Sequence, residues 1–275
     1  MTQNERRRFL IEYLLNESPR YKDVEIPSDE AGQKYLLRSL MNVREPFPAS
    51  DDFLHIQDEY LQETNRSHVI TDIEALKPIG DFDLSTGLRD RKLNHRSDLY
   101  LWRGDITTLR VGAIVNAANS GMTGCWQPCH SCIDNCIHTF AGIQLRAVCA
   151  RLMQKQGHEE PTGSAKITPA FNLPCDYVLH TVGPIISGPL TQRDCELLAS
   201  CYTSCLDLAE QNNVQSIAFC CISTGVFHFP ADRAAQIAVQ TVENWKHEHN
   251  SSIKVVFNVF SEKDEAIYRD VFGIQ

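Results

Sequence analysis

The chain of 275 residues has 26 Lys and Arg against 35 Asp and Glu, a net charge of −9 with neutral histidines. This balance argues against a protein that wraps nucleic acid, because a surface that follows phosphates needs clustered Lys and Arg. The longest apolar runs, such as 216–222, fall far short of the roughly 20 residues that cross a bilayer, and Glu5 and Glu12 argue against a signal peptide. We therefore expect a cytoplasmic protein with no membrane or nucleic-acid partner.

Residues 1–76 are expected to form an α-helical N-terminal extension. Three groups of apolar residues recur at helical spacing, and Pro27, Pro46 and Pro48 separate them. We predict that the extension packs on the main domain; a separate partner-binding module is the alternative. The three groups are Phe9, Leu10, Tyr13 and Leu14; Leu36, Leu37, Leu40 and Met41; and Phe53, Ile56, Tyr60 and Leu61.

Strands and helices alternate after a linker rich in Gly, Asp and Pro at 77–87. This alternation predicts one α/β domain over 77–275, with a largely parallel sheet covered on both faces. Ligands of such folds bind beyond the carboxyl ends of strands, where loops 116–132 and 223–230 are expected. The predicted strands are 99–103, 113–116, 166–169, 177–182, 216–222 and 253–260, and helices are expected at 133–154, 191–211, from 230 and from 261.

Three residues of metal-ligand type fall within eight positions of each other, at Cys125, His130 and Cys132. Thiolate and imidazole are the ligands that zinc prefers, and three ligands leave one coordination position open for water or substrate. The pattern therefore predicts a zinc site. Cys129 could supply a fourth ligand and close the site, and reduced cysteines that only pack are the remaining alternative. His138 is a weaker candidate ligand, and we expect it on a helix surface instead.

The other cysteines have a simpler interpretation. The chain has eleven, and without a secretion signal thiols or metal ligands are more consistent with it than a disulfide framework. Cys201 and Cys205 continue an apolar helical stripe, and Cys220 and Cys221 lie in an apolar strand. We expect these four to pack in the core.

Two further segments carry polar groups at strand ends. Asn116 and Asn119 follow the strand at 113–116, where amides satisfy turns or bind sugar hydroxyls, and the sequence does not decide between these roles. The segment STGVFHFP at 223–230 offers backbone N–H groups to a diphosphate, although Gly there also suits turn geometry alone. Asp105 in RGDIT either caps a turn or accepts a hydrogen bond from an exocyclic amine.

Taken in order, GDIT, IVNAANS, a polar Gly turn and STGVF resemble the macrodomain family. The insertion GCWQPCHSC is similar to the zinc-containing branch of that family, the protein-ADP-ribose hydrolases. The resemblance covers about 77–275, and the helical extension is also similar to that branch. It implies a three-layer α/β/α macrodomain with a mixed central sheet that binds ADP-ribose in a cleft.

The resemblance also implies roles for individual residues. Asp105 would recognise the adenine amine with help from the backbone of Ile106, Asn119 would lie by the distal ribose, and Phe260 is a possible stacking partner for adenine. The expected zinc ligands are Cys125, His130 and Cys132. The diphosphate and distal ribose would contact Ser223, Thr224, Gly225, Val226 and Phe227, together with Cys132, Ile133 and Asp134.

The implied activity is zinc-dependent removal of mono-ADP-ribose from modified protein side chains. In our hypothesis zinc activates or positions the nucleophile, Asn119 orients the ribose, and Asp134 acts as a base or as an anchor. Three alternatives stay open: a reader module that binds ADP-ribose without cleaving it, a deacylase of O-acetyl-ADP-ribose, and a zinc ion that only staples a loop.

Overall fold

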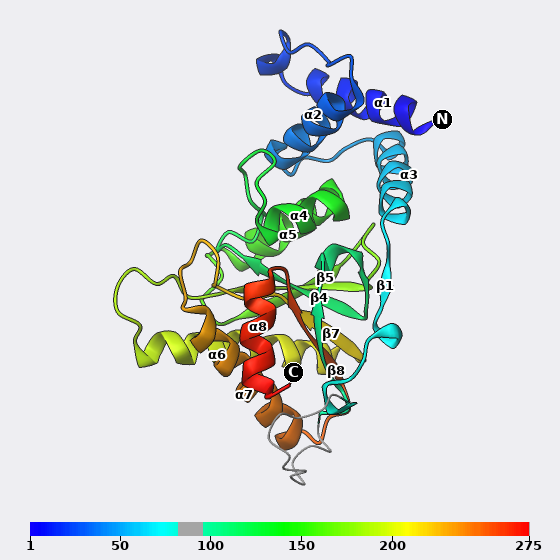
Figure 1. Cartoon of the computed structure of the whole chain (residues 1–275). Helices are drawn as coiled ribbons and strands as arrows, with labels where there is room; N and C mark the ends of the chain where they lie inside the picture. The colour runs from blue at the N-terminus through cyan, green and yellow to red at the C-terminus, as the bar shows by residue number, and fades with distance from the viewer. Residues whose placement is uncertain (82–95, 275) are drawn as a thin grey trace.

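The computed structural model of the chain describes residues 1–81 and 96–274, so the predicted linker 77–87 lies partly outside the described residues. Figure 1 shows an α/β region below and a group of helices from the N-terminal part above it. None of the helices in the described ranges is long and apolar enough to span a bilayer.

A six-stranded mixed sheet forms the centre of the α/β region. Its strand order is β2-β8-β7-β4-β6-β5, and all neighbouring strands run parallel except the antiparallel pair of β5 and β6. β1 (Thr71–Asp72) and β3 (Leu109–Arg110) form a separate parallel pair. The six strands are β2 (Leu99–Arg103), β4 (Ala113–Ala118), β5 (Ala165–Pro169), β6 (Tyr177–Val182), β7 (Ser216–Phe219) and β8 (Lys254–Val259).

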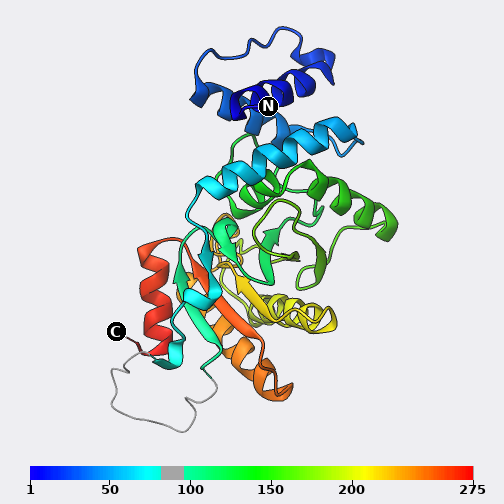
Figure 2. The same cartoon turned by 90° about the vertical axis from the view of Figure 1, so that its right-hand side faces the viewer.

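Helices cover the sheet on both faces. Nearly every residue of β4, β6, β7 and β8 is buried, which requires cover on each side. α4 and α5 contact β4 and β5, whereas α6, α7 and α8 pack on one another in series (Figures 1 and 2). The predicted three-layer α/β/α class is confirmed. The helices are α4 (Ile133–Ala141), α5 (Ile143–Gln156), α6 (Gln192–Gln211), α7 (Ala231–Glu248) and α8 (Glu262–Phe272).

The predicted helical extension is present as α1 (Gln3–Asn16), α2 (Glu30–Val43) and α3 (Asp51–Ser67). These helices bury their own apolar cluster, which includes Leu10, Leu37 and Phe53, and Ile143 of α5 joins it. The extension therefore packs on the α/β region. The boundary between residues 76 and 77 stays a prediction, and Ile73 already belongs to the main core. Short 3-10 helices are η1 (Pro19–Tyr21), η2 (Ile73–Ala75), η3 (Ile79–Asp81) and η5 (Ile106–Thr108).

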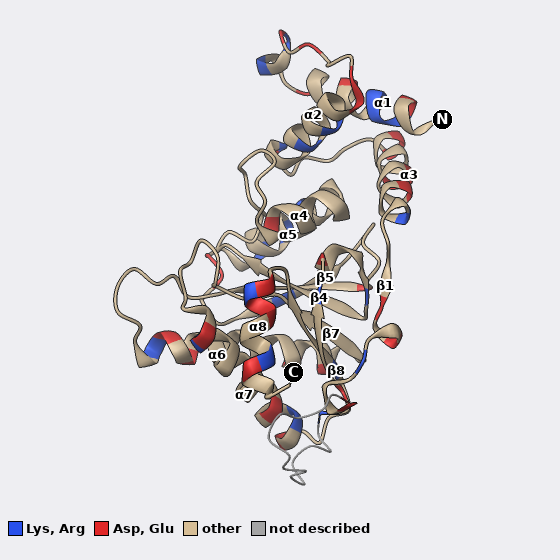
Figure 3. Cartoon of the chain, viewed as in Figure 1, with Lys and Arg blue, Asp and Glu red and all other residues tan. Residues whose placement is uncertain are grey.

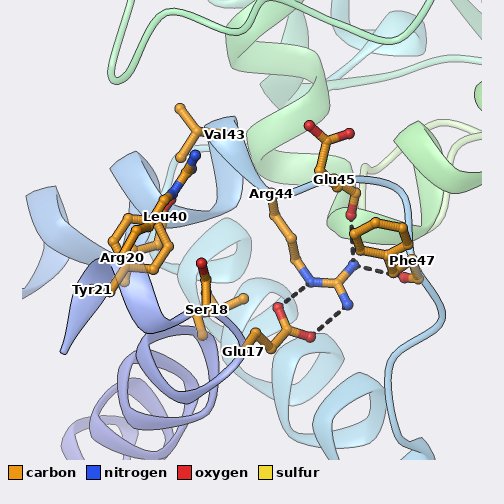
Figure 4. A pocket seen from close by; sticks show the side chains of 10 residues that line it. Glu17, Ser18, Arg20, Tyr21, Leu40, Val43, Arg44, Glu45 and Phe47 are labelled. Carbon is orange, nitrogen blue, oxygen red and sulfur yellow. Dashed lines mark hydrogen bonds and ion pairs between the residues drawn. The ribbon is translucent and has the colours of Figure 1, made fainter.

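A cavity of about 270 Å³ lies within the extension, between the ends of α1 and α2 (Figure 4). At its edge the buried Arg44 guanidinium donates two hydrogen bonds of 2.7 Å to the Glu17 carboxylate. This pairing ties the end of α1 to the end of α2. The cavity contains no residue from loops 116–132 or 223–230, so it is distinct from the predicted ligand site.

Acidic and basic residues are interleaved along α1 and α8 (Figure 3). Arg103 at the end of β2 pairs with Glu262 at 3.1 Å and with Glu265 at 2.8 Å, both on α8. Arg6 joins α1 to α3 in the same way, through Glu59 and Glu63. Exposed pairs of this kind contribute about 1 kcal/mol or less each, so packing rather than charge fixes these helices.

The helix expected at 133–154 is wrong in one respect, because it is broken at Gly142 into α4 and α5. Gly142 has φ +99° and ψ 170°, a conformation that is essentially confined to glycine. The apolar period continues across the break, which is why the sequence pattern does not reveal it. The strand expected at 216–222 is also shorter, since β7 ends at Phe219.

Gly142→Ala should lower the free energy of unfolding by about 3 kcal/mol, because it adds backbone strain and a steric clash. A Cβ at Gly142 would lie 2.6 Å from Gln144 Oε1 and 2.7 Å from Gln57 Nε2. Gly157 is the matched control: its φ is +79°, but nothing lies within 4 Å of an added Cβ, so Gly157→Ala should cost only about 1 kcal/mol. Urea unfolding checks both values, and equal losses would contradict this account.

Candidate functional site

Three of the predicted site segments meet at one edge of the sheet. Asp105 follows β2, Asn119 follows β4, and the loop beginning near Ser223 follows β7. Because β2, β8, β7 and β4 are consecutive parallel strands, their carboxyl ends lie at the same edge. The structure therefore places these segments where ligands bind in this class of sheet.

The Asp134 carboxylate lies beside the end of β4, on the first turn of α4. It is 5% exposed and accepts one hydrogen bond on each oxygen, from Asn116 Nδ2 at 2.8 Å and from Asn119 Nδ2 at 3.3 Å. Burial raises the pKa of Asp134 to about 6, although both amides and the Arg146 charge oppose the rise. The site thus holds a fixed carboxylate whose pKa lies near neutrality.

Asn119 also organises the turn that leaves β4. Its Nδ2 donates to Gly124 O at 3.1 Å, and its Oδ1 accepts from the Gly121 N–H at 3.0 Å. Of the two roles left open by the sequence, turn formation is observed directly. A carbonyl oxygen has two lone pairs, so Oδ1 keeps one acceptor position for a ligand.

A buried chain of hydrogen bonds supports Asp134 from across three strands. Asn116 on β4 lies directly opposite His180 on β6, and its Nδ2 donates to His180 Nδ1 at 3.1 Å. The Nε2–H of His180 then donates to Thr168 Oγ1 on β5 at 2.9 Å. Burial lowers the pKa of His180 to about 3, so its ring is neutral near pH 7. The chain fixes the amide that holds the carboxylate.

The expectation that His138 lies on a helix surface is wrong. His138 is 5% exposed, and its Nε2 lies 3.5 Å from Asp134 Oδ1. Burial is the main cause that lowers its pKa well below the usual value, so the ring is neutral. The inward orientation follows from the period of α4, because His138 is one turn after Asp134.

The three predicted metal ligands lie together. Ligand atoms of Cys125, His130 and Cys132 are all within 4.8 Å of one another, and Cys125 Sγ is 3.7 Å from His130 Nδ1. Zinc–sulfur and zinc–nitrogen bonds of normal length at a tetrahedral angle require a separation of about 3.6 Å. Burial raises the pKa of the Cys132 thiol to about 12, so a cation is needed to make it a thiolate near neutrality. The residues present therefore fit a zinc ion.

Cys129 does not join this group. Its Sγ lies 3.2 Å from Ser39 Oγ and 3.5 Å from Tyr35 O, both on α2. Its backbone has φ +53°, which turns the side chain toward the extension. Among the described residues, the group therefore consists of the three predicted side chains without Cys129.

The loop at 223–227 follows β7 at the same sheet edge. Ser223 has φ +65° and a buried Oγ. Gly225 and Val226 are exposed at the tip, and Ile186 N donates to Phe227 O at 2.8 Å. Within the described ranges, four buried polar atoms of the site have no hydrogen-bond partner: Ser223 Oγ, Asn116 Oδ1 and both ring nitrogens of His138. Such groups are usually satisfied by a ligand or by water.

Asp105 and its neighbours are arranged as a cap. Asp105 Oδ1 accepts from the Thr107 N–H at 2.9 Å and from Thr107 Oγ1 at 2.6 Å, which starts the short helix η5. Both bonds use one oxygen, and Oδ2 makes no hydrogen bond to any residue in the described part of the chain. Ile106 is buried, whereas Phe260 is 79% exposed and is not a core residue.

The sequence analysis did not predict that three further residues support the site: His180, Thr168 and Arg146. A histidine and a threonine inside apolar strands, at His180 and Thr168, are a signal for an internal polar chain. Arg146 is a lone charge between Leu145 and Cys149 on an otherwise apolar helix face, and only 4% of it is exposed. An arginine in that position indicates buried carbonyl or carboxylate partners.

Comparisons with known proteins agree on one family. Residues 115–238 match the Macro domain family. The chain is 70% identical over 273 residues to a protein-ADP-ribose hydrolase of Treponema medium, covering 99% of this chain and 100% of the relative. It is 48% identical over 269 residues to a protein-ADP-ribose hydrolase of Staphylococcus aureus strain MSSA476, covering 96% and 95%. A Trypanosoma brucei macrodomain solved in complex with ADP-ribose has a TM-score of 0.63 and 30% identity, covering 85% of this chain and 94% of that one.

His180→Gln should make the stability of the protein less sensitive to acid. The pKa of His180 is about 3 in the folded protein against an ordinary value of 6.5, so the unfolded chain binds the extra proton between these values. The contribution of His180 to the free energy of unfolding is therefore complete above pH 6.5. It falls by about 1.4 kcal/mol for each pH unit below that value. Glutamine keeps one donor and one acceptor but does not titrate.

Urea unfolding of both proteins at pH 7.5 and pH 5 measures this difference. We expect the variant to lose less stability than the wild type between the two values. Identical losses would show that His180 is not held neutral in the folded state.

Proposed function

This chain is an enzyme of the macrodomain family, and we propose that it is a zinc-dependent hydrolase that removes mono-ADP-ribose from modified protein side chains. One observation carries the proposal: three clustered zinc-type ligands lie next to a buried, doubly hydrogen-bonded carboxylate at the ligand edge of the sheet. The Cys132 ligand is two residues from Asp134, and Asn119 contacts the same carboxylate. The names of the two near-full-length relatives support the same reaction.

The substrate would be held along the sheet edge. Asp105 Oδ2 is suited to accept a hydrogen bond from the adenine amine, and the exposed N–H groups around Gly225 suit the diphosphate. Asn119 Oδ1 would accept from a hydroxyl of the distal ribose. This order would bring the bond between ribose and protein close to Asp134, which Asn119 contacts.

Cleavage needs a water molecule, a base and a leaving group. Water attacks the anomeric carbon of the distal ribose, and the bond from that carbon to the side-chain atom of the protein breaks. The side-chain atom leaves with its electron pair and takes up the proton that the water has given to the base. Asp134 is placed to take the proton from the water, because two amides fix both of its oxygens and its pKa of about 6 keeps it ionised at neutral pH. A zinc ion held by Cys125, His130 and Cys132 would supply Lewis-acid assistance to an oxygen of the reacting centre.

Asp134→Asn should lower the rate of ADP-ribose release by about 10²- to 10⁴-fold, the usual contribution of a positioned base. Affinity for free ADP-ribose should fall much less than the rate, since asparagine keeps the shape of the site and one of the two accepting oxygens. The measurements are release from a mono-ADP-ribosylated protein and binding by calorimetry, with bound zinc determined in both proteins. A variant that loses its zinc would instead make Asp134 an anchor of the metal loop.

Cys132→Ser should abolish both zinc binding and turnover, whereas Cys129→Ser should retain both. The two cysteines are three residues apart, but only Cys132 contributes to the ligand group, and Cys129 Sγ faces Ser39. The substitution is identical, so the pair separates loss of a ligand from loss of any thiol in the loop. Metal content by elemental analysis and ADP-ribose release measure the outcome. Loss of zinc in Cys129→Ser would mean that the site is closed by a fourth ligand.

Two other activities are separated by the choice of substrate. A reader module would bind ADP-ribose and release none from a modified protein. A deacylase would hydrolyse O-acetyl-ADP-ribose and leave the modified protein intact. Parallel assays with these two substrates therefore assign the reaction.

A further inference from the structure

The loop that carries the zinc-type ligands contacts the helical extension. We call residues 123–132 the metal loop. In the described structure this segment contains neither helix nor strand, and in Figure 1 it extends upward from the α/β region toward α2. A loop without regular structure needs outside contacts to hold three ligands at bonding distance from one ion.

Arg38 on α2 contacts the backbone of one ligand directly. Its Nη2 donates to His130 O at 2.9 Å and to Asn135 Oδ1 at 2.9 Å. Asn135 is fully buried and donates in turn to Gln127 O at 2.9 Å. A single guanidinium on the extension thus holds the end of the metal loop against the start of α4.

Asn42, one turn further along α2, fixes the middle of the loop. Its Oδ1 accepts from the Cys129 N–H at 2.9 Å, and its Nδ2 donates to Thr139 Oγ1 on α4 at 2.9 Å. Only 1% of Asn42 is exposed. Cys129 is held at φ +53°, an uncommon backbone conformation for a residue other than glycine. Asn42 therefore stabilises the bend that separates Cys125 from His130 and Cys132.

Arg146 on α5 joins the same two segments from the other side. It donates to Thr123 O at 2.7 Å and Cys125 O at 3.3 Å in the metal loop, and to Asn42 O at 2.6 Å and Arg44 O at 3.0 Å at the end of α2. Its guanidinium carbon also lies 4.1 Å from the centre of the Trp126 ring. The cation suits the carboxyl end of α2, where the helix dipole is negative.

We propose that helix α2 is the support of the metal loop, with Arg38 and Asn42 as positioning residues that set zinc affinity. The inference rests on the proposed zinc site, and it assigns the extension a role in the active centre rather than in partner binding. Outer contacts of this kind orient metal ligands, and their loss lowers metal affinity by about 10- to 100-fold.

The test is a zinc titration of the full chain in competition with a chromophoric chelator. Arg38→Met and Asn42→Ala should each weaken zinc binding by about 10- to 100-fold, and Arg38→Lys should restore part of it, because lysine still donates to His130 O. Affinity for ADP-ribose, measured by calorimetry, should stay at the wild-type value in all three.

Arg7→Met is the matched control. Arg7 is a buried arginine of the extension that contacts Gln33, Asn4 and Glu30 but not the metal loop. This variant should bind zinc like the wild type, even where its melting temperature falls. Equal losses in Arg7→Met and Arg38→Met would show a general effect of extension stability and would overturn the inference.

The remaining outcomes separate this inference from the proposed function. Wild-type zinc affinity in both Arg38→Met and Asn42→Ala would overturn the role of α2 and leave the zinc site intact. A wild-type protein that binds no zinc in the titration would overturn both the zinc site and the role of α2.

Discussion

The site depends on a buried carboxylate, and the fold has to replace the water that this carboxylate loses on burial. Removing an ionised carboxylate from water costs several kcal/mol unless hydrogen bonds or charges replace the water. Asp134 obtains this compensation from Asn116 and Asn119, which lie three residues apart around the end of β4, and from its place on the first turn of α4. Both amides are fixed only if β4 and α4 keep their positions, so the hydrogen bonds of this carboxylate depend on the packing of α4 against the sheet.

Further contacts in the sheet and in the extension hold the groups around Asp134 in place. The register of β4 with β6 places His180 opposite Asn116, and the antiparallel β5 brings Thr168 to the other side of that ring. Residues of α2 and the buried Arg146 hold the backbone of residues 123–130. Changes to the contacts with residues 123–130 alone should therefore leave the sheet intact and alter the relative positions of Cys125, His130 and Cys132.

Most of the fold follows from local sequence patterns. Alternating apolar strands and helices predicted the six-stranded sheet and its cover, and the prolines of the extension separated its three helices correctly. The strain at Gly142 could not be predicted, because the apolar period of 133–154 is continuous and only tertiary contacts with Gln57 favour the break. The macrodomain class expected from four short motifs is confirmed by the family match and the solved relatives.

The site was predictable where residue type alone carries the chemistry. Cys125, His130 and Cys132 lie within eight positions of the sequence, so the spacing alone predicted that they could meet, although not which contacts hold the loop. The orientation of Cys129 and the burial of His138 depend on contacts with α2 and with Asp134 that no short spacing encodes. Zinc itself, the domain boundary at residue 76 and a cytoplasmic location stay predictions.

The most direct test of the account is release of ADP-ribose from a mono-ADP-ribosylated protein by enzyme as purified, stripped of metal and reloaded with zinc. Bound zinc and ADP-ribose affinity are measured in each state. We expect release to disappear with the metal and to return with zinc, while ADP-ribose binding persists. Full release by metal-free protein would contradict the account, and so would binding without release in every state.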